Sequence, residues 1–356
     1  MSKIELIANE KCYIEYMAEK QLNDVGNLKG VTRAVGLPDL HAGKIPIGIA
    51  VETKDIIYPH LIGNDIGCGM RLINTGISNK KFKKDKLVNK LNKINDLKEI
   101  ETINLYEEES PILNLGTIGG GNHFAEFQAL ENVYNEEEFA KLEFSKNDIM
   151  LLIHCGSRGY GESILRKFLD YDGLNIESSI AKEYLKKHDD ALLWAERNRR
   201  IVGEKLLNYL GFSGDRKMII DCNHNFIEKI KDSYIHRKGA VSSKNGAVII
   251  PGSRGNLSYI VMPTKSAENY LNSLSHGAGR KWSRSVCKGN LKNKYDKEAL
   301  KETKLKSSVV CHDLNLLYQE APEAYKNIEA IINCLLEYNL IKVIATMKPL
   351  ITFKCR

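Results

Sequence analysis

The chain has 356 residues, of which 27% are charged and 43% hydrophobic, and this is the composition of an ordinary globular protein with a sizeable core. No run approaches the roughly 18 apolar residues of a membrane span, and the first segment, MSKIELIANE, is charged too early for a secretory signal, so we expect neither a membrane nor a secreted protein. The net charge of +7 permits a polyanionic partner such as nucleic acid without demanding one.

The first half of the chain is typical of strands and turns with one amphipathic helix. Residues 31–75 combine β-branched apolar runs with glycine and proline, which predicts strands. Residues 84–99 predict a helix whose buried face carries Leu87, Leu91, Ile94 and Leu97. A glycine-rich turn and then a strand are expected over 111–128. The apolar run 147–155 predicts a buried strand that ends in a glycine turn.

The second half combines a long helical stretch with short strands. Residues 161–211 are expected to be mostly helical, with core contacts from Leu185, Leu192, Leu193, Ile201, Leu206 and Leu210. Short apolar runs predict strands at 218–222, 240–243, 247–251 and 258–263. A helix over 322–338 is expected to begin at Pro322 and to bury Ile328, Ile331, Ile332 and Leu335, and a strand follows at 341–346. Because strands and helices mix without regular βαβ alternation, we expect an α+β fold.

The cysteines indicate the cellular compartment. Eight of them are scattered along the chain without a CxxC pair. In a long chain without a secretory signal, this pattern predicts reduced thiols and a cytoplasmic protein rather than a disulfide framework. Most are expected to be small buried residues.

Polar residues suited to chemistry gather in short segments at the ends of predicted strands. These are Asp65 and Cys68 in GNDIGCGM, Asn122, His123 and Glu126 in GGGNHFAEF, His154 in IHCGSRGYG, Asn223, His224 and Asn225 in DCNHNF, and His276 in SHGAGR. Turns after strands collect side chains on one rim of a sheet. Thiolate, imidazole and carboxylate together suit Mn, Zn, Fe or Co, and a thiolate can bridge two ions. The pattern therefore predicts a metal site, without fixing the number of ions.

Each of these residues alone has a simpler interpretation. A single histidine is more often a satisfied core or surface residue than a ligand, and glycine neighbours can simply mark turns. That interpretation is the first choice for His41, His60, His188, His236 and His312. Repetition of the pattern at successive strand ends is what favours a common site.

Two small-residue loops have the composition of anion-binding turns. They are Gly277-Ala278-Gly279-Arg280 and Pro251-Gly252-Ser253-Arg254-Gly255. Small residues let backbone N–H groups approach phosphate, and arginine adds paired hydrogen bonds. With Arg158 and Arg284, they favour a polyphosphate or a nucleic-acid backbone as ligand; the alternative is tight turns with surface arginines. A histidine beside such loops could be a nucleophile on phosphorus.

Several motifs of the chain resemble those of a known protein family. GNDIGCGMR, LGTIGGGNHFAEFQ, IHCGSRGYG, IPGSRGNLSYIV and SHGAGRKWSR resemble the RtcB family of RNA-splicing ligases, and the match runs from PDLHAGKIPIG to the terminal PLITFK. The resemblance implies a single RtcB-like catalytic domain over 1–356, with mixed sheets flanked by helices and the active site at strand ends. It implies a ligase that uses GTP and Mn to join an RNA 2′,3′-cyclic phosphate or 3′-phosphate end to a 5′-hydroxyl end.

The resemblance also implies roles for individual residues. Asp65, Cys68 and His123 would hold one Mn ion, and Cys68, His154 and His224 the second. His276 would be the nucleophile that takes GMP from GTP. The residues implied to contact the guanine nucleotide are Asn122, His123, Phe124, Ala125, Glu126, His224, Asn225, Pro251, Gly252, Ser253, Arg254, Ser258, His276, Gly277, Ala278, Gly279, Tyr325 and Lys354.

Some features depart from the family pattern. The chain is shorter than typical members, carries Arg254 where many members have methionine, and continues GAGR with Lys281 and Trp282. These features resemble a divergent branch often found beside a peptide-release-factor homologue. That branch implies repair of a specific broken RNA, such as a ribosomal one, rather than tRNA splicing, and an activating protein or the release-factor homologue as a partner.

Two other functions fit the same residues. A metal-dependent phosphodiesterase could act on cyclic phosphates without guanylylation of His276, and it would need no GTP. An RNA-binding or chaperone module with a degenerate metal site would bind RNA equally well without metal. All the implied metal ligands and His276 are present, which argues against a degenerate metal site.

Overall fold

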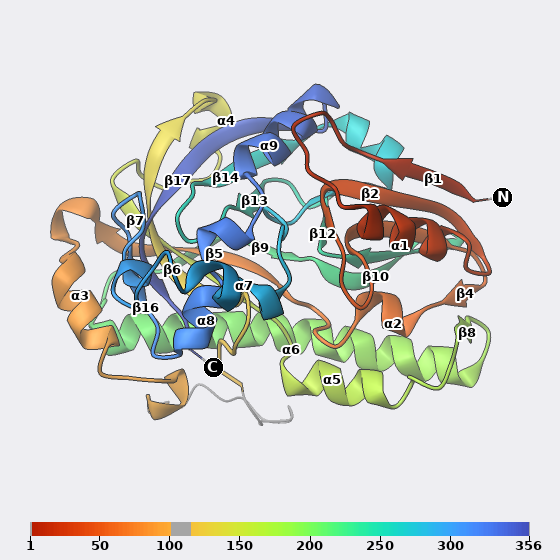
Figure 1. Ribbon diagram of the computed structural model, residues 1–356, viewed down its shortest axis with the longest axis horizontal. Coiled ribbons are helices and arrows are strands. Elements are labelled where there is room, and N and C mark those ends of the chain that lie inside the picture. The colour runs from red at the N-terminus through yellow and green to blue at the C-terminus, as the bar shows by residue number, and fades with distance from the viewer. Residues whose placement is uncertain (1, 101–114, 356) are drawn as a thin grey trace.

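The computed structural model describes residues 2–100 and 115–355, and it confirms the expected α+β class (Figure 1). In these ranges the larger sheet has the strand order β13 (Val248–Pro251), β14 (Ser258–Pro263), β17 (Ile341–Phe353), β6 (Phe124–Val133), β7 (Asp148–Cys155), β5 (Gly69–Ser78) and β9 (Lys217–Asn223), with β16 (Ser308–Val310) beside β17.

A second sheet lies beside the larger one, on the right in Figure 1. Its strand order is β1 (Lys3–Leu6), β2 (Val31–His41), β3 (Ile47–Thr53), β11 (Ser233–Lys238) and β10 (Asn225–Ile230). Short two-stranded ladders pair β12 (Ala240–Ser242) with β15 (Ser273–Ser275), and β4 (Ile56–Ile57) with β8 (Leu174–Asn175).

Helices flank the sheets, and the longest, α6, runs along the lower side of both in Figure 1. They are α1 (Tyr16–Gly26), α2 (Pro59–Ile62), α3 (Lys84–Leu91), α4 (Glu136–Ala140), α5 (Gly159–Arg166), α6 (Ser179–Leu210), α7 (Arg284–Leu291), α8 (Leu314–Gln319) and α9 (Ile328–Glu337). None of the helices in the described ranges has both the length and the apolar composition of a membrane span.

The predicted buried strand 147–155 is the central strand β7. Residues 149–153 have no exposed surface. Met150 and Leu152 belong to one hydrophobic cluster, whereas Leu151 and Ile153 belong to another that includes Val202 of α6. Both faces of the strand are therefore covered, which explains its continuous apolar run.

The predicted helical stretch 161–211 is formed mainly by α6. Its first turn is capped by Ser178, whose hydroxyl accepts a hydrogen bond from the backbone N–H of Ala181, and it ends at Gly211 in the left-handed conformation. The prediction that Leu193 contacts the core is wrong, because its side chain is 66% exposed. Leu193 lies away from the buried face, which repeats at three- and four-residue spacing.

Two predicted helices have the right buried face but the wrong length. The helix expected over 84–99 ends at Leu91, and the Asp96 side chain starts a separate 3₁₀ turn by accepting from the Lys98 N–H. The helix expected from Pro322 begins only at Ile328, because Asn327 caps it. The apolar contacts expected of both helices are nevertheless buried.

The strand expected at 341–346 continues to Phe353 as β17. Lysine and proline at 348–349 are typical of a strand end, but here they lie next to a register irregularity, where proline is tolerated. The hairpin of β10 and β11 was not predicted, since charged residues, among them Glu228 and Arg237, interrupt its apolar pattern. In the fold Arg237 is buried and paired with Glu228 on the neighbouring strand.

Candidate active site

Four neighbouring strands of the larger sheet bring the predicted metal ligands to one edge. β6, β7, β5 and β9 are antiparallel neighbours, so β6 and β5 begin at the edge where β7 and β9 end. His123 precedes β6, Cys68 precedes β5, His154 is the penultimate residue of β7, and His224 follows β9. The structure therefore places these side chains on one rim, as their positions at strand ends predict.

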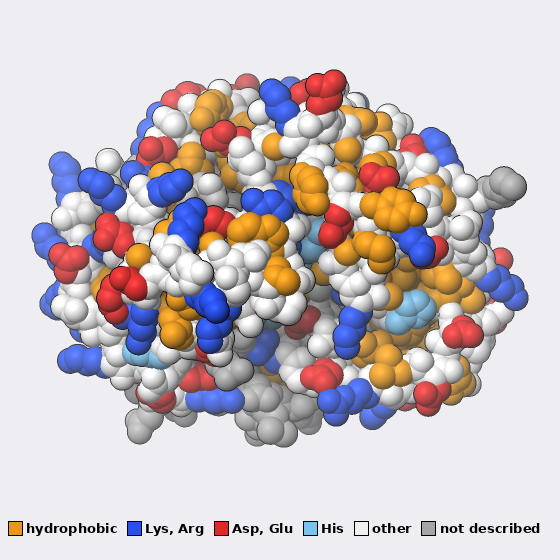
Figure 2. Space-filling view, viewed as in Figure 1, with side chains coloured by type: hydrophobic (Ala, Val, Ile, Leu, Met, Phe, Trp, Pro, Cys, Tyr) orange, Lys and Arg blue, Asp and Glu red, His pale blue; other side chains and the backbone are white. Residues whose placement is uncertain are grey.

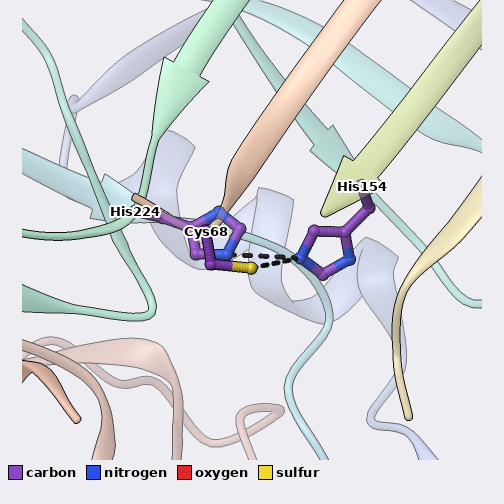
Figure 3. A group of neighbouring side chains, drawn as sticks. All are labelled: Cys68, His154 and His224. Atoms are coloured by element: carbon purple, nitrogen blue, oxygen red, sulfur yellow. Dashed lines mark hydrogen bonds between the residues drawn. The ribbon is translucent and has the colours of Figure 1, made fainter. Parts of the chain in front are cut away.

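Cys68 lies between two groups of potential ligands in the described part of the chain. One group is Asp65, Cys68 and His123, the other is Cys68, His154 and His224, and in each the ligand atoms lie within 4.8 Å of one another. Cys68 Sγ is 3.2 Å from His154 Nε2 and 3.3 Å from His123 Nε2. Figure 3 shows Cys68, His154 and His224 converging from separate strands. The donor set fits one transition ion on each side of the thiol.

Burial governs the protonation of these ligands. It lowers the pKa of His154 and of His224 well below the usual imidazole range, so both rings are neutral and carry a lone pair. Burial, and then the charge of Asp65, raises the pKa of Cys68 well above its usual value. Burial also opposes ionisation of Asp65, but the neighbouring His123 outweighs it and lowers the carboxyl pKa. The thiol is therefore the ligand whose proton a bound cation must displace.

Arg199 of α6 is fully buried behind the ligands. Its guanidinium donates to the carbonyl oxygens of Gly67 (2.8 Å) and Cys155 (3.1 Å) and to Asn223 Oδ1 (2.7 Å), and it pairs with Asp221. Gly67, Cys155 and Asn223 each adjoin a predicted metal ligand in the chain, so Arg199 ties three ligand-bearing segments together. Nothing in the sequence indicates this role, since arginines in amphipathic helices are mostly exposed.

His276, the predicted nucleophile, follows β15 and is held by Asp39 of β2. His276 Nδ1 lies 2.7 Å from Asp39 Oδ2. Burial would raise the pKa of Asp39, but the hydrogen bond with His276 outweighs it and lowers the pKa. In a neutral ring this hydrogen bond places the proton on Nδ1 and leaves the lone pair on Nε2. The ring lies beside His224, with centroids 4.7 Å apart. Asp39 stands in the motif PDLHAGKIPIG, but only the fold brings it to His276.

The predicted metal ligands and His276 line one cavity of about 1200 Å³. All the residues predicted to bind metal or nucleotide line it except Ala125 and Ser258. Ala125 is buried in the core, and the Ser258 hydroxyl accepts a hydrogen bond from Gln128. Asn225 lines the cavity and also donates to the backbone oxygen of Asp65 (3.2 Å), so it positions a ligand. In Figure 2 the viewed face is hollowed near its centre, and lysines and arginines are spread among acidic side chains.

Part of the cavity wall holds a buried carboxyl group and a buried ammonium group. Glu126 accepts hydrogen bonds from Gln128 Nε2 (2.8 Å) and Thr352 Oγ1 (2.5 Å), and burial raises its pKa to about 7. Lys354 Nζ donates to the backbone oxygen of His123 (2.7 Å). Fixed donors and acceptors in a largely desolvated wall suit the polar edge of a heterocyclic base.

The arginines of the glycine and serine turns are not simply surface residues. Arg254 is 7% exposed, and the side chain of Arg280 is 13% exposed. Arg280 and Arg284 both reach the buried Glu320, at 3.2 and 3.4 Å. The alternative of tight turns with surface arginines is therefore wrong for Arg254 and Arg280, and all three arginines line the cavity.

Comparisons with known proteins identify relatives along nearly the whole chain. A family model described as tRNA-splicing ligase RtcB matches residues 21–102 and 92–355. The RNA-splicing ligase RtcB2 of an Escherichia coli strain is 40% identical, with 98% of this chain and 94% of the relative covered. The RNA-splicing ligase RtcB of Escherichia coli K12 is 28% identical (96% and 95% covered), and the tRNA-splicing ligase RtcB of Archaeoglobus fulgidus is 26% identical (95% and 91% covered).

The alignments also bear on the length of the chain. The alignment with the Archaeoglobus fulgidus protein extends over 439 positions, more than the 356 residues of this chain, whereas that with RtcB2 extends over 364. The alignment with the Archaeoglobus fulgidus protein therefore includes positions that have no counterpart in this chain. RtcB2 matches this chain with few gaps.

Proposed function

Because the chain belongs to the RtcB family of RNA-splicing ligases, we propose that it is an RNA ligase that uses GTP and two manganese ions. It joins a 2′,3′-cyclic phosphate or 3′-phosphate end of RNA to a 5′-hydroxyl end. The observation that carries this proposal is the single thiol of Cys68 between two ligand groups, with the His276 ring next to His224 of one group. Such a site can hold a triphosphate against a nitrogen nucleophile.

In the proposed reaction His276 Nε2 attacks the α-phosphorus of GTP. A nitrogen–phosphorus bond forms, the bond to the bridging oxygen breaks, and pyrophosphate leaves. Asp39 holds the Nδ1 proton and stabilises the positive charge that develops on the ring. An oxygen of the RNA 3′-phosphate then attacks the same phosphorus and releases His276. Finally the 5′-hydroxyl attacks the activated 3′-phosphate and expels GMP.

The proposed metal ligands are the two groups that share Cys68. Asp65, Cys68 and His123 would hold one manganese ion, and Cys68, His154 and His224 the other. Bound ions supply Lewis-acid stabilisation of the charge on the phosphates. The chain itself contributes the neutral imidazoles of His154 and His224, and Arg158 at the cavity wall.

We expect manganese to bind more tightly as the pH rises. The pKa of the Cys68 thiol is raised, so the free protein holds a proton that the metal must displace, whereas the pKa values of His154 and His224 are lowered and these rings do not compete. Release of one proton predicts about a tenfold gain in affinity per pH unit. Calorimetric titration with Mn²⁺ at two pH values, in buffers of different ionisation enthalpy, measures the affinity and counts the proton. An affinity that does not change with pH would contradict a thiolate ligand.

The proposed function is tested with α-labelled GTP and manganese, followed by denaturing separation of the protein. We expect a covalent label that is stable to alkali, labile to acid and absent from His276→Ala, because a phosphoramidate hydrolyses in acid. His312→Ala removes an exposed histidine outside the cavity and should label normally. If the metal-loaded protein takes up no label, the proposal fails for the protein by itself, and either the phosphodiesterase alternative or a ligase that needs its partner protein is favoured.

We further propose that the substrate is a specific broken RNA, and that an activating protein or a release-factor homologue is a partner. The shortness of the chain and its close alignment with RtcB2 support a branch distinct from the longer relatives.

A further inference from the structure

Lys281 and Trp282 lie on the cavity wall but belong neither to the metal ligands nor to the group around His276. Both line the cavity, and Lys281 is exposed whereas Trp282 is half-buried. Their backbone N–H groups both donate to the oxygen of Ala324 (2.8 and 3.2 Å), and Arg280 Nε donates to the oxygen of Trp282 (3.0 Å). The backbone therefore holds the indole ring at a fixed place on the wall.

The indole ring of Trp282 has the surroundings of a stacking surface. It packs against the hydrophobic cluster that contains Leu291 and Leu317, so the fold supports its position. It still keeps exposed surface at the cavity, and Lys281 Nζ lies 5.0 Å from the ring centroid. Proteins that bind single-stranded nucleic acids stack bases on such aromatic rings, with cations beside them.

A row of basic side chains leads away from this part of the cavity along α7. Arg284, Lys288 and Lys292 are four residues apart, so they lie on one side of the helix and advance by about 6 Å at each step. All three are exposed, and Arg284 lines the cavity, whereas the two lysines lie outside it. Lys288 Nζ donates to the neutral side chain of Asn315 (3.1 Å), and no carboxylate of residues 2–100 and 115–355 forms an ion pair with either lysine. The positive charges of the two lysines are therefore available to a partner.

The charge around α7 identifies the kind of partner. Residues 280–306 contain ten lysines and arginines but three acidic residues, so their net charge of +7 equals that of the whole chain. A mononucleotide inside the cavity cannot reach Lys288 and Lys292, which lie outside it. An acidic protein would match the lysines alone. An RNA strand matches the lysines through its phosphates and Trp282 through a base.

We propose that Trp282, Lys288 and Lys292 form the track along which a single RNA strand enters the cavity. A base next to the broken end stacks on Trp282, and the phosphates that follow lie along α7. The inference rests on the proposed function, in which the RNA end reaches the GMP carried by His276. The three residues position the strand and take no part in the bond changes.

The first test measures binding of a fluorescent single-stranded RNA with a 3′-phosphate by anisotropy, with manganese and without GTP. Trp282→Leu keeps an apolar side chain against the core but removes the ring, so we expect about ten- to a hundredfold weaker binding, whereas Trp282→Tyr restores most of the affinity. Equal binding by Trp282→Leu and wild type overturns the proposal. So does a Trp282→Leu protein that loses RNA binding and the covalent GMP label together, since that result assigns the ring to the nucleotide pocket.

The second test replaces Lys288 and Lys292 together by glutamine. We expect weaker RNA binding and a shallower dependence of log affinity on log salt concentration, by about 0.7 for each lost phosphate contact. The matched control replaces Lys182 and Lys186 by glutamine, which removes the same charge from the exposed side of α6 outside the cavity. If both double variants have the same salt dependence, the lysines of α7 fit an acidic protein rather than RNA, and the proposal is overturned.

Fluorescence of the wild-type protein provides a measurement that needs no variant to fold. Trp282 is half-buried, whereas the other tryptophan, Trp194, is 3% exposed, so a base that stacks on Trp282 quenches the emission as RNA binds. Inorganic polyphosphate, which carries the charge without bases, should leave the emission unchanged. Emission that bound RNA does not alter overturns the proposal. RNA binding that follows all these predictions without a GMP adduct supports the track, while the ligase proposal fails for the protein by itself.

Discussion

Cys68→Ala is expected to lose bound manganese at both positions and to form no covalent GMP adduct. Cys68 Sγ is the atom that the two ligand groups share, and each group without it keeps only two side chains. A thiolate at Cys68 would also offset part of the charge of bound cations, which alanine cannot do. Metal analysis of the purified protein and α-labelled GTP measure the two effects on one sample.

The matched control for this substitution is Cys12→Ala. Cys12 is also buried, but it contacts Ala330 of α9 and lies in neither ligand group. We expect normal metal content and normal labelling from this variant. Full metal stoichiometry in Cys68→Ala would disprove the bridging role, whatever its effect on catalysis.

Arg199→Met is expected to destabilise the protein by about 1–3 kcal/mol, because it removes one of the two arginine partners of Asp221, which keeps its pair with Arg71. It also removes the donors to the Gly67 and Cys155 carbonyl oxygens, which then stay buried without those hydrogen bonds. The segments that carry Cys68 and His154 lose their common support. Urea unfolding, followed by fluorescence, measures the free energy of unfolding, and manganese titration measures the effect on the site.

The neighbouring Arg200→Met provides the comparison. Arg200 pairs with Glu204 on the exposed side of the same helix, so its loss should change the free energy of unfolding by less than about 0.5 kcal/mol. Arg71 also pairs with Asp221, so the carboxylate keeps one partner in Arg199→Met. An unfolding free energy equal to that of Arg200→Met would show that Arg199 does not hold the site together.

Sequence alone predicted the α+β class, the central strand β7 and the buried faces of α3, α6 and α9. These features depend on side chains close together in the chain, since alternation and three-to-four spacing are local properties. The motifs around Cys68, His123, His154 and His276 likewise marked the candidate site. The residue types and the glycine turns of these motifs indicate the chemistry of the site without knowledge of the fold.

Element ends depended on details that the pattern does not contain. Asn327 and Asp96 begin new turns through their side chains, and Pro349 remains in β17 because the strand register shifts beside it. The β10–β11 hairpin was missed because Arg237 is buried only after it pairs with Glu228. Whether a cap or an ion pair overrides the periodic pattern can be judged only from its geometry in the folded chain.

Only the tertiary structure decided how the site is supported. Asp39 is 237 residues from His276 in the chain, and Arg199 bonds to segments that precede and follow it by many residues. Whether Arg254 lies at the surface or inside the cavity also depended on the packing of α8 against its turn. The sequence by itself determined which chemical groups the site contains. Their distances, protonation and hydrogen-bond partners come from contacts between segments far apart in the chain, and folding alone creates those contacts.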